Sequence, residues 1–271
     1  MILNALATLA VGIAPKVFDV PVQPGYGFAV DKDGSFLIAA RVDGKQACRV
    51  SRYKPVAGGM ATKIVEYNSD YEGAVEILPL KSGFMVVDFE GSSIYTYSDD
   101  GKQQSKIHAR YPNVAKLDFD GNAWFFFNSG IVASLTSDSS VPEPALRASG
   151  EEIAVHGAAD LGPTSRRKFW MMNEGGEVSF YDEFGRSKKV GTYPDVQRLF
   201  GMKNGNVLLY FGKVFKVLSP NGALKEVATV PAEHSRNITF MGRAFDGSLT
   251  LATSNSSGGK VVIFDFKLGA L

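Results

Sequence analysis

The stretch FDGNAWFFFN, residues 119–128, decides the fold. Its Asp-Gly pair accepts the positive φ angles of a tight hairpin turn. The apolar run that follows has the length and composition of a strand buried on both faces. The sequence therefore predicts a strand, a tight turn and a second, fully buried strand.

The same turn recurs along the chain, and its spacing gives the architecture. The other clear copies are KDGS (residues 32–35), KSGF (81–84), KNGN (203–206) and FDGS (245–248). The turn glycines are Gly34, Gly83, Gly121, Gly205 and Gly247, with spacings of 49, 38, 84 and 42 residues. Because 84 is twice 42, a looser copy is expected near residues 160–166, in LGPTSRRK. Units of about 40 to 45 residues are typical of four-stranded propeller blades.

The remaining strands of each unit fit a blade that runs outward from a central channel. Third strands alternate in polarity, as in SIYTYS (residues 93–98), and fourth strands such as QQSKIHA (103–109) are more polar. The last unit stops after KVVIFDF (260–266), and KVFDVPV (16–22) can supply its outer strand. We predict an all-β, six-bladed β-propeller of four-stranded antiparallel blades, closed by the N-terminal strand. Residues 1–15 would be an apolar arm and residues 16–271 a single propeller domain.

The D-x-D-G and D-x-x-G turns resemble those of the NHL and strictosidine-synthase-like propellers over residues 16–267, a resemblance of architecture only. WD40 propellers are disfavoured because no Gly-His and Trp-Asp pairs occur here, and kelch propellers because no Gly-Gly doublet follows each second strand. An alternative is two β-domains joined near the polar residues 137–152. We interpret that segment instead as an irregular outer edge of the third blade.

Composition excludes several classes of partner. Lys and Arg number 29 against 28 for Asp and Glu, so no overall field attracts nucleic acid, and no nucleic acid partner is predicted. Cys48 is the only cysteine, which excludes an internal disulfide and leaves a buried apolar residue or a reactive thiol.

Propellers of this size host metal-dependent lactonases and phosphotriesterases, which hold a divalent ion in the channel with several oxygen ligands. Here the two rings of inner-strand positions seven and three residues before the turn glycines lack such a set. The first ring is Gly27, Glu76, Val114, Arg198 and Phe240, and the second is Asp31, Leu80, Asp118, Met202 and Ala244. Glu72 and Gly73 resemble the Glu-Gly that opens the senescence-marker-type lactonases, without the remaining ligands. We therefore predict no catalytic residue, no metal and no cofactor.

Other chemical motifs favour structural interpretations. The histidines His108, His156 and His234 are far apart in sequence, so they form no local metal pair. The aromatic run 124–127 is better explained by packing than by a sugar or base platform. Residues 166–168 are interpreted as a solvated basic turn.

The N-terminal arm carries the functional prediction. Leu3, Leu6, Leu9 and Ile13 recur at helical spacing, and leaving them in water forfeits roughly 1.5 to 3 kcal/mol each. We predict that they bind a protein partner, and that the chain is a non-catalytic structural or interaction module, not an enzyme. It would be a subunit of a larger assembly, such as a phage or virion tail- or capsid-associated protein. A cytoplasmic or virion location is favoured over secretion, and no transmembrane segment is predicted. The alternatives are a metal-dependent hydrolase or lactonase with its site in the channel, and a propeller that binds glycans or peptides.

Overall fold

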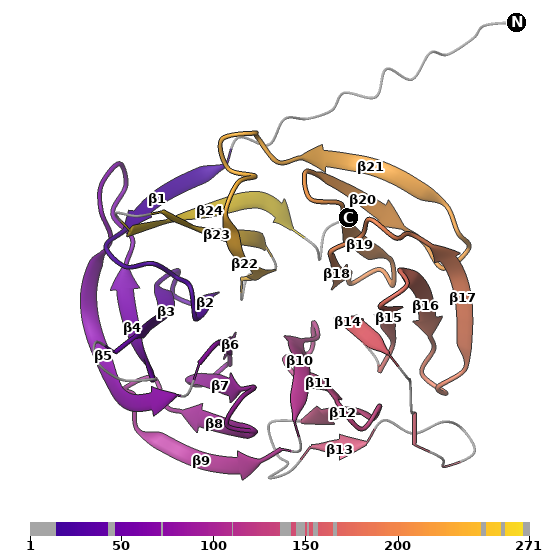
Figure 1. Ribbon diagram of the computed structural model, residues 1–271, viewed down its shortest axis with the longest axis horizontal. Helices are drawn as coiled ribbons and strands as arrows, with labels where there is room; N and C mark the ends of the chain where they lie inside the picture. The colour runs from indigo at the N-terminus through magenta and orange to yellow at the C-terminus, as the bar shows by residue number, and fades with distance from the viewer. Residues whose placement is uncertain are drawn as a thin grey trace, which may run out of the picture.

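The computed structural model describes residues 15–42, 47–71, 73–109, 111–135, 142–144, 150, 152–153, 157–164, 167–244, 248–255 and 258–267. Within these ranges the chain forms six four-stranded antiparallel sheets and no helix. The sheets surround a central axis as the blades of a propeller (Figure 1). The predicted all-β class, blade number and strand number are confirmed.

Each blade contributes one inner strand that borders the channel. The inner strands are β2 (Gly27–Val30), β6 (Val75–Pro79), β10 (Pro112–Leu117), β14 (Ala158–Pro163), β18 (Arg198–Gly201) and β22 (Ile238–Arg243). The second strands are β3 (Phe36–Arg41), β7 (Phe84–Asp88), β11 (Ala123–Phe127), β15 (Phe169–Asn173), β19 (Val207–Tyr210) and β23 (Ser248–Asn255). We number the blades 1 to 6 in this order.

The third and outer strands complete the blades. The third strands are β4 (Cys48–Lys54), β8 (Ser93–Tyr97), β12 (Val132–Leu135), β16 (Glu177–Tyr181), β20 (Val214–Leu218) and β24 (Gly258–Lys267). The outer strands are β5 (Thr62–Tyr71), β9 (Gln103–His108), β13 (Glu143–Pro144), β17 (Ser187–Thr192), β21 (Leu224–Thr229) and β1 (Lys16–Val20). The outer strand of blade 3 is thus only two residues long.

The N-terminal strand closes the ring, as predicted. β1 pairs antiparallel with β24, from Lys16 opposite Ile263 to Val20 opposite Gly259. Blade 6 therefore contains the order β1-β24-β23-β22, in which the first and last strands of the chain are neighbours. Closure of this kind gives β24 a partner and leaves no free edge between the two ends.

The tight turns follow the sequence prediction, with one difference in blade 4. Gly34, Gly83, Gly121 and Gly205 have φ angles of +78°, +83°, +87° and +88°. The sequence predicts the looser turn of blade 4 near residues 160–166. β14 instead covers Ala158–Pro163, and the turn is closed by a hydrogen bond from Thr164 N to Lys168 O at 2.9 Å.

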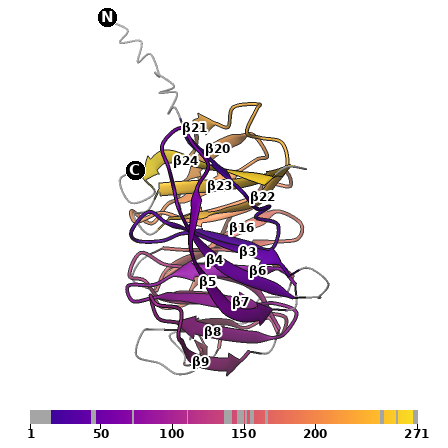
Figure 2. The same cartoon turned by 90° about the vertical axis from the view of Figure 1, so that its left-hand side faces the viewer.

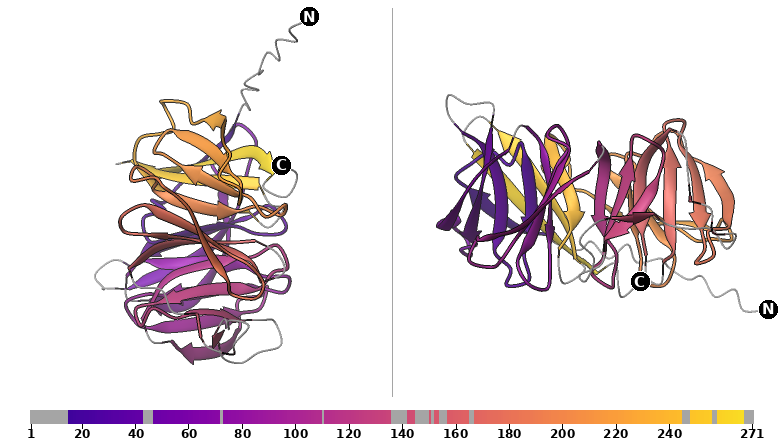
Figure 3. Two further views of the ribbon diagram at one scale, coloured as in Figure 1. Left: turned by 90° about the vertical axis from the view of Figure 1, so that its right-hand side faces the viewer. Right: turned by 90° about the horizontal axis from the view of Figure 1, so that it is seen from below.

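The hydrophobic core consists of layers between neighbouring blades rather than one central mass. One layer joins Leu37 and Val50 of blade 1 to Ile77 and Phe84 of blade 2, and five further layers repeat this arrangement around the ring. Residues 124–127 are buried in such layers, which confirms their interpretation as packing residues. Side views show the blades as twisted sheets standing around the axis (Figures 2 and 3).

No described helix is long and apolar enough to span a membrane.

Candidate active site

Four charged side chains come from four consecutive inner strands. They are Glu76 on β6, Lys116 on β10, Asp160 on β14 and Arg198 on β18. Each of the four perturbs the pKa of at least one other, so they form one electrostatic unit. We call this set the channel cluster.

Lys116 bridges blades 3, 4 and 5. Its ammonium Nζ lies 2.6 Å from Asp160 Oδ1 and donates a second hydrogen bond to Leu199 O at 2.7 Å. The other carboxylate oxygen of Asp160 accepts a bond from Leu199 N at 2.7 Å. Leu199 thus presents both backbone groups to the cluster, and Lys116 and Asp160 satisfy both of them.

Local backbone features place Asp160 against blade 5. The pairing of β14 with β15 shifts register between Ala158 and Asp160, a β-bulge that re-aims the side chains beside it. β14 and β18 also approach closely, because a Cβ on Gly201 would lie only 2.0 Å from Pro163 O. Glycine is required at this contact. The short strand separation brings the Asp160 carboxylate within hydrogen-bond reach of Leu199.

Glu76 differs from Asp160 in its electrostatic pairing. Within the described part of the chain, no cation forms an ion pair with its carboxylate. Burial raises the pKa of Glu76 from its ordinary value of 4.5 to about 7, although Lys116 and Arg198 oppose the shift. Glu76 and Lys116 line the same cavity of about 50 Å³, which has room for a few water molecules. A carboxylate that has a pKa near neutrality and lines a cavity with room for water is suited to general acid–base chemistry.

Lys116 supplies a fixed positive charge to the same cavity. Burial lowers its pKa, and the neighbouring Asp160 opposes that shift. Two of its three ammonium hydrogens are used by Asp160 and Leu199, which leaves one for another acceptor. Its charge also lies 5.1 Å from the centre of the Phe200 ring. The arrangement can stabilise a negative oxygen that develops in the cavity.

The channel donors do not fit a divalent metal ion. Asp160 already neutralises the Lys116 ammonium and accepts bonds from Leu199 N and Leu161 N. A second cation at this carboxylate would have to displace Lys116 from Asp160. Among the described residues, no group of three or more His, Cys, Asp or Glu side chains is placed to hold a metal. We therefore derive no chemical step through a metal ion.

The charged members of the two predicted inner-strand rings lie in two different places, the channel cluster and the tight turns. Of the first ring, Glu76 and Arg198 belong to the channel cluster. Asp31 and Asp118 of the second ring are buried in the turns that follow the inner strands, where Asp118 accepts bonds from Asn122 N and Trp124 Nε1. The remaining members of both rings are apolar residues or Gly27 and contribute no charge.

Sequence reasoning missed Lys116 and Asp160. Lys116 lies five residues before Gly121, between the two ring positions, and Asp160 lies in blade 4, whose looser turn lacks the glycine from which the spacing is counted. A usable signal was present, since each is a single charge in an otherwise apolar inner strand, VAKL and AADLG. Glu76 in VEILP shows the same signal.

Other predicted residues lie away from the channel cluster or outside the described residues. Cys48 is buried, its thiol donates to Gly73 O at 2.7 Å, and burial raises its pKa to about 11, so it is a poor nucleophile. His108 is exposed on outer strand β9. The described residues do not include Glu72, His156, Arg166, Leu3, Leu6, Leu9 or Ile13.

Comparison with known proteins supports the fold and bears on the functional prediction. No family model and no curated protein sequence matches this chain. Among solved structures, a gluconolactonase of Xanthomonas campestris is similar with a TM-score of 0.61 and 12% identity, over 95% of this chain and 93% of its own. A streptogramin B lyase has a TM-score of 0.56 and 11% identity, over 93% and 98%. The WD40 propeller domain of Doa1 has a TM-score of 0.53 and 14% identity, over 94% and 97%. At these identities the likeness concerns the fold.

The prediction of a non-catalytic assembly or virion subunit is wrong. Two of the similar propellers, matched over nearly their whole length, are enzymes by name. The prediction that the chain is not an enzyme is corrected with it. That prediction rested on the absence of a ring of oxygen ligands at fixed spacings, whereas Lys116 and Asp160 join Glu76 and Arg198 in the channel cluster from positions outside those rings. The structure supports the β-propeller architecture and lends nothing to the assembly interpretation.

Proposed function

We propose that this protein is a hydrolase that opens a lactone, or cleaves a related carboxylic ester, in the central channel without a metal ion. Glu76 is the general base and Lys116 stabilises the oxyanion. One observation carries the proposal: a carboxylate with a pKa of about 7 shares a cavity with a fixed ammonium group. The likeness to a gluconolactonase lends support through the fold, as does the water-sized cavity.

The chemistry is balanced with these two groups alone. The Glu76 carboxylate takes a proton from water while the water oxygen bonds to the carbonyl carbon, and the carbonyl π electrons move to the carbonyl oxygen. The free N–H of Lys116 donates to that oxyanion. The carbonyl then re-forms, the C–O bond to the ring oxygen breaks, and the leaving oxygen takes the proton from Glu76. The product is an open-chain hydroxy acid, and Glu76 returns to its carboxylate form.

The test compares the wild-type chain with Glu76→Gln on a panel of sugar γ-lactones, by titrating the acid released. Loss of a general base is expected to lower kcat by about 10² to 10⁴. The wild-type rate should rise with pH through about 7, because only ionised Glu76 accepts the proton. Glu174→Gln, at an exposed turn residue, is the matched control and should retain full activity.

Three results would contradict the proposal: no hydrolysis across the panel, unchanged activity in Glu76→Gln, or a pH profile flat around 7. Hydrolysis in ¹⁸O-water adds one ¹⁸O to the product. A product without ¹⁸O would instead indicate elimination, as in a lyase.

We also propose, as a separate matter, that Leu3, Leu6, Leu9 and Ile13 contact a protein partner. The apolar character of residues 1–15 is its support. Gel filtration with and without residues 1–14 tests it, and an unchanged elution volume of the chain with its co-purifying proteins would contradict it.

A further inference from the structure

A polar groove lies between blades 5 and 6, next to the channel. Its volume is about 550 Å³, within the range of small-molecule sites. Its polar lining residues include Gln197, Arg198, Ser235, Asn237 and Thr239. Its apolar wall includes Phe240 and Met241. We call this the blade 5–6 groove.

The groove adjoins the catalytic cavity. Met241 lines both the groove and the channel cavity that holds Glu76 and Lys116. Arg198 lines the groove and also lies near enough to both of these residues to shift their pKa values. The cavity of about 50 Å³ is too small for more than a reacting carbonyl and its water, so the rest of a substrate must lie elsewhere. The groove is the adjacent space.

Arg198 gives the groove a positive charge that no carboxylate in the described part of the chain neutralises. Its side chain is exposed, and its one hydrogen bond within the described residues is to the carbonyl of Gln197, at 2.9 Å. No described carboxylate forms an ion pair with it. The guanidinium has five N–H donors in a planar fork that matches a carboxylate, so most of its donors are open to an anion.

The backbone of the groove is also specialised. Asn237 has a φ of +58°, in a region that non-glycine residues rarely occupy. The pairing of β22 with β23 shifts register between Ile238 and Phe240 directly after it. Such outliers and bulges concentrate at binding sites, where they re-aim side chains. Asn237 and the start of β22 line the same groove as Arg198.

We propose that the blade 5–6 groove binds the non-reacting part of the substrate, and that this part is a free carboxylate on a hydroxylated chain. The substrate class is therefore an anionic hydroxylated lactone or ester. Arg198 receives the carboxylate, while Ser235, Asn237 and Thr239 offer hydrogen bonds to hydroxyl groups. The inference rests on the proposed hydrolase function and names its substrate class.

Two sugar lactones that differ only in whether they carry a carboxylate serve as probes. D-Glucaro-1,4-lactone carries a carboxylate where D-glucono-1,4-lactone carries a neutral CH₂OH. Binding of each is measured by calorimetry on Glu76→Gln, in which turnover does not interfere, and hydrolysis is measured on the wild type. We expect the anionic lactone to bind about tenfold more tightly and to be hydrolysed with a correspondingly higher kcat/KM.

Variants of Arg198 test the assignment within the Glu76→Gln background. Arg198→Gln should abolish the preference for the anionic lactone, and Arg198→Lys should keep part of it. Arg236→Gln, which removes a nearby exposed arginine that does not line the groove, should keep all of it. Melting curves establish that the variants fold, and Arg198 and Arg236 are both exposed.

The outcomes separate the two proposals. Equal binding of the two lactones, binding of neither, or a preference that survives Arg198→Gln overturns the groove assignment. Selective binding through Arg198 without wild-type hydrolysis supports the groove and overturns the hydrolase. Hydrolysis of both lactones at equal kcat/KM supports the hydrolase and overturns the groove.

Discussion

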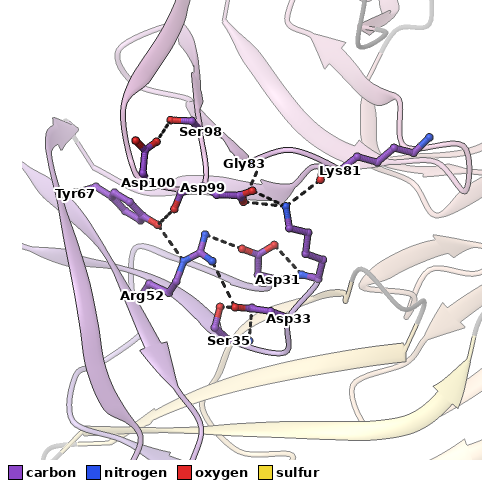
Figure 4. A network of polar contacts seen from close by, with 11 residues as sticks. Asp31, Asp33, Ser35, Arg52, Tyr67, Lys81, Gly83, Ser98, Asp99 and Asp100 are labelled. Atoms are coloured by element: carbon purple, nitrogen blue, oxygen red, sulfur yellow. Dashed lines mark hydrogen bonds and ion pairs between the residues drawn. The ribbon is translucent and has the colours of Figure 1, made fainter.

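Two polar clusters in this propeller contain the same types of charged residue but differ in how completely the charges are paired. Between blades 1 and 2, a network formed by Asp31, Lys32, Arg52, Tyr67 and Asp99 joins the tight turns (Figure 4). We call it the blade 1–2 network. In the channel cluster, Glu76, Lys116, Asp160 and Arg198 lie along four inner strands.

In the blade 1–2 network each charge has a partner. Arg52 Nη2 lies 2.8 Å from Asp31 Oδ2, as an ion pair without the alignment of a hydrogen bond, and Arg52 Nε donates to the Tyr67 hydroxyl at 3.0 Å. Lys32 Nζ lies 2.8 Å from Asp99 Oδ2 and reaches across from blade 1 to blade 2. These contacts pair each charge with an opposite one and link blade 1 to blade 2.

In the channel cluster the pairing is incomplete. Asp160 and Lys116 form an ion pair, while Glu76 is half-buried beside them without an ion pair among the described residues. Desolvation without compensation moves its pKa to about 7. The difference teaches that the identity of a buried carboxylate decides little. The presence or absence of an ion-pair partner decides whether the carboxylate stabilises the fold or remains available for proton transfer.

The largest effect on stability should follow from breaking the blade 1–2 network at its buried pair. Arg52→Met leaves Asp31 buried without its counter-charge, since the two side chains are 9% and 0% exposed. Removing one partner of a buried ion pair costs about 3 to 5 kcal/mol. Burial already raises the pKa of Asp31, and loss of Arg52 should raise it further. The folded state can then protonate Asp31 at low pH, so the loss should be larger at pH 8 than at pH 5 in urea unfolding.

The exposed pair of the same network is the control. Lys32 and Asp99 are 31% and 51% exposed, and exposed ion pairs contribute about 0 to 1 kcal/mol. Lys32→Met should therefore cost less than 1 kcal/mol. Equal losses from Arg52→Met and Lys32→Met would show that burial does not separate the two pairs.

A smaller effect on stability, of opposite sign, is expected from substitution of Glu76. Its folded-state pKa of about 7 exceeds the ordinary 4.5 of the unfolded chain, so the folded state binds more protons between these values. The stability that this proton uptake contributes is fully present below pH 4.5 and is lost as pH rises through 7. Glutamine stays neutral, so Glu76→Gln should melt at a higher temperature than wild type at pH 8 and at about the same temperature at pH 5.

This measurement tests the comparison without reference to activity. Asp160→Asn, which breaks the compensated pair with Lys116, should instead lower the melting temperature at pH 8. If Glu76→Gln destabilised the protein at pH 8 as Asp160→Asn does, Glu76 would be a paired structural carboxylate, and its assignment as the base would lose its basis.

The sequence alone determined the architecture of the ring. Asp-Gly and Asn-Gly turns require positive φ, and apolar and alternating strands have distinct positions in a blade, so local chemistry repeated along the chain specifies blade number and strand order. The closing strand followed from counting strands, because blade 6 lacked a fourth partner until residues 16–22 supplied it. These features depend on short-range preferences, which are visible in the order of residues.

Only the tertiary structure decided the candidate site. Glu76, Lys116, Asp160 and Arg198 are separated by 38 to 44 residues from one to the next, and nothing local announces that they meet. Their convergence depends on a β-bulge before Asp160 and on the close approach of two inner strands at Gly201. The pKa of Glu76 depends on its burial and on the charges around it, which are properties of the folded ring. Burial and long-range electrostatics exist only once the blades have packed, and for that reason the sequence specified the propeller while the fold specified its chemistry.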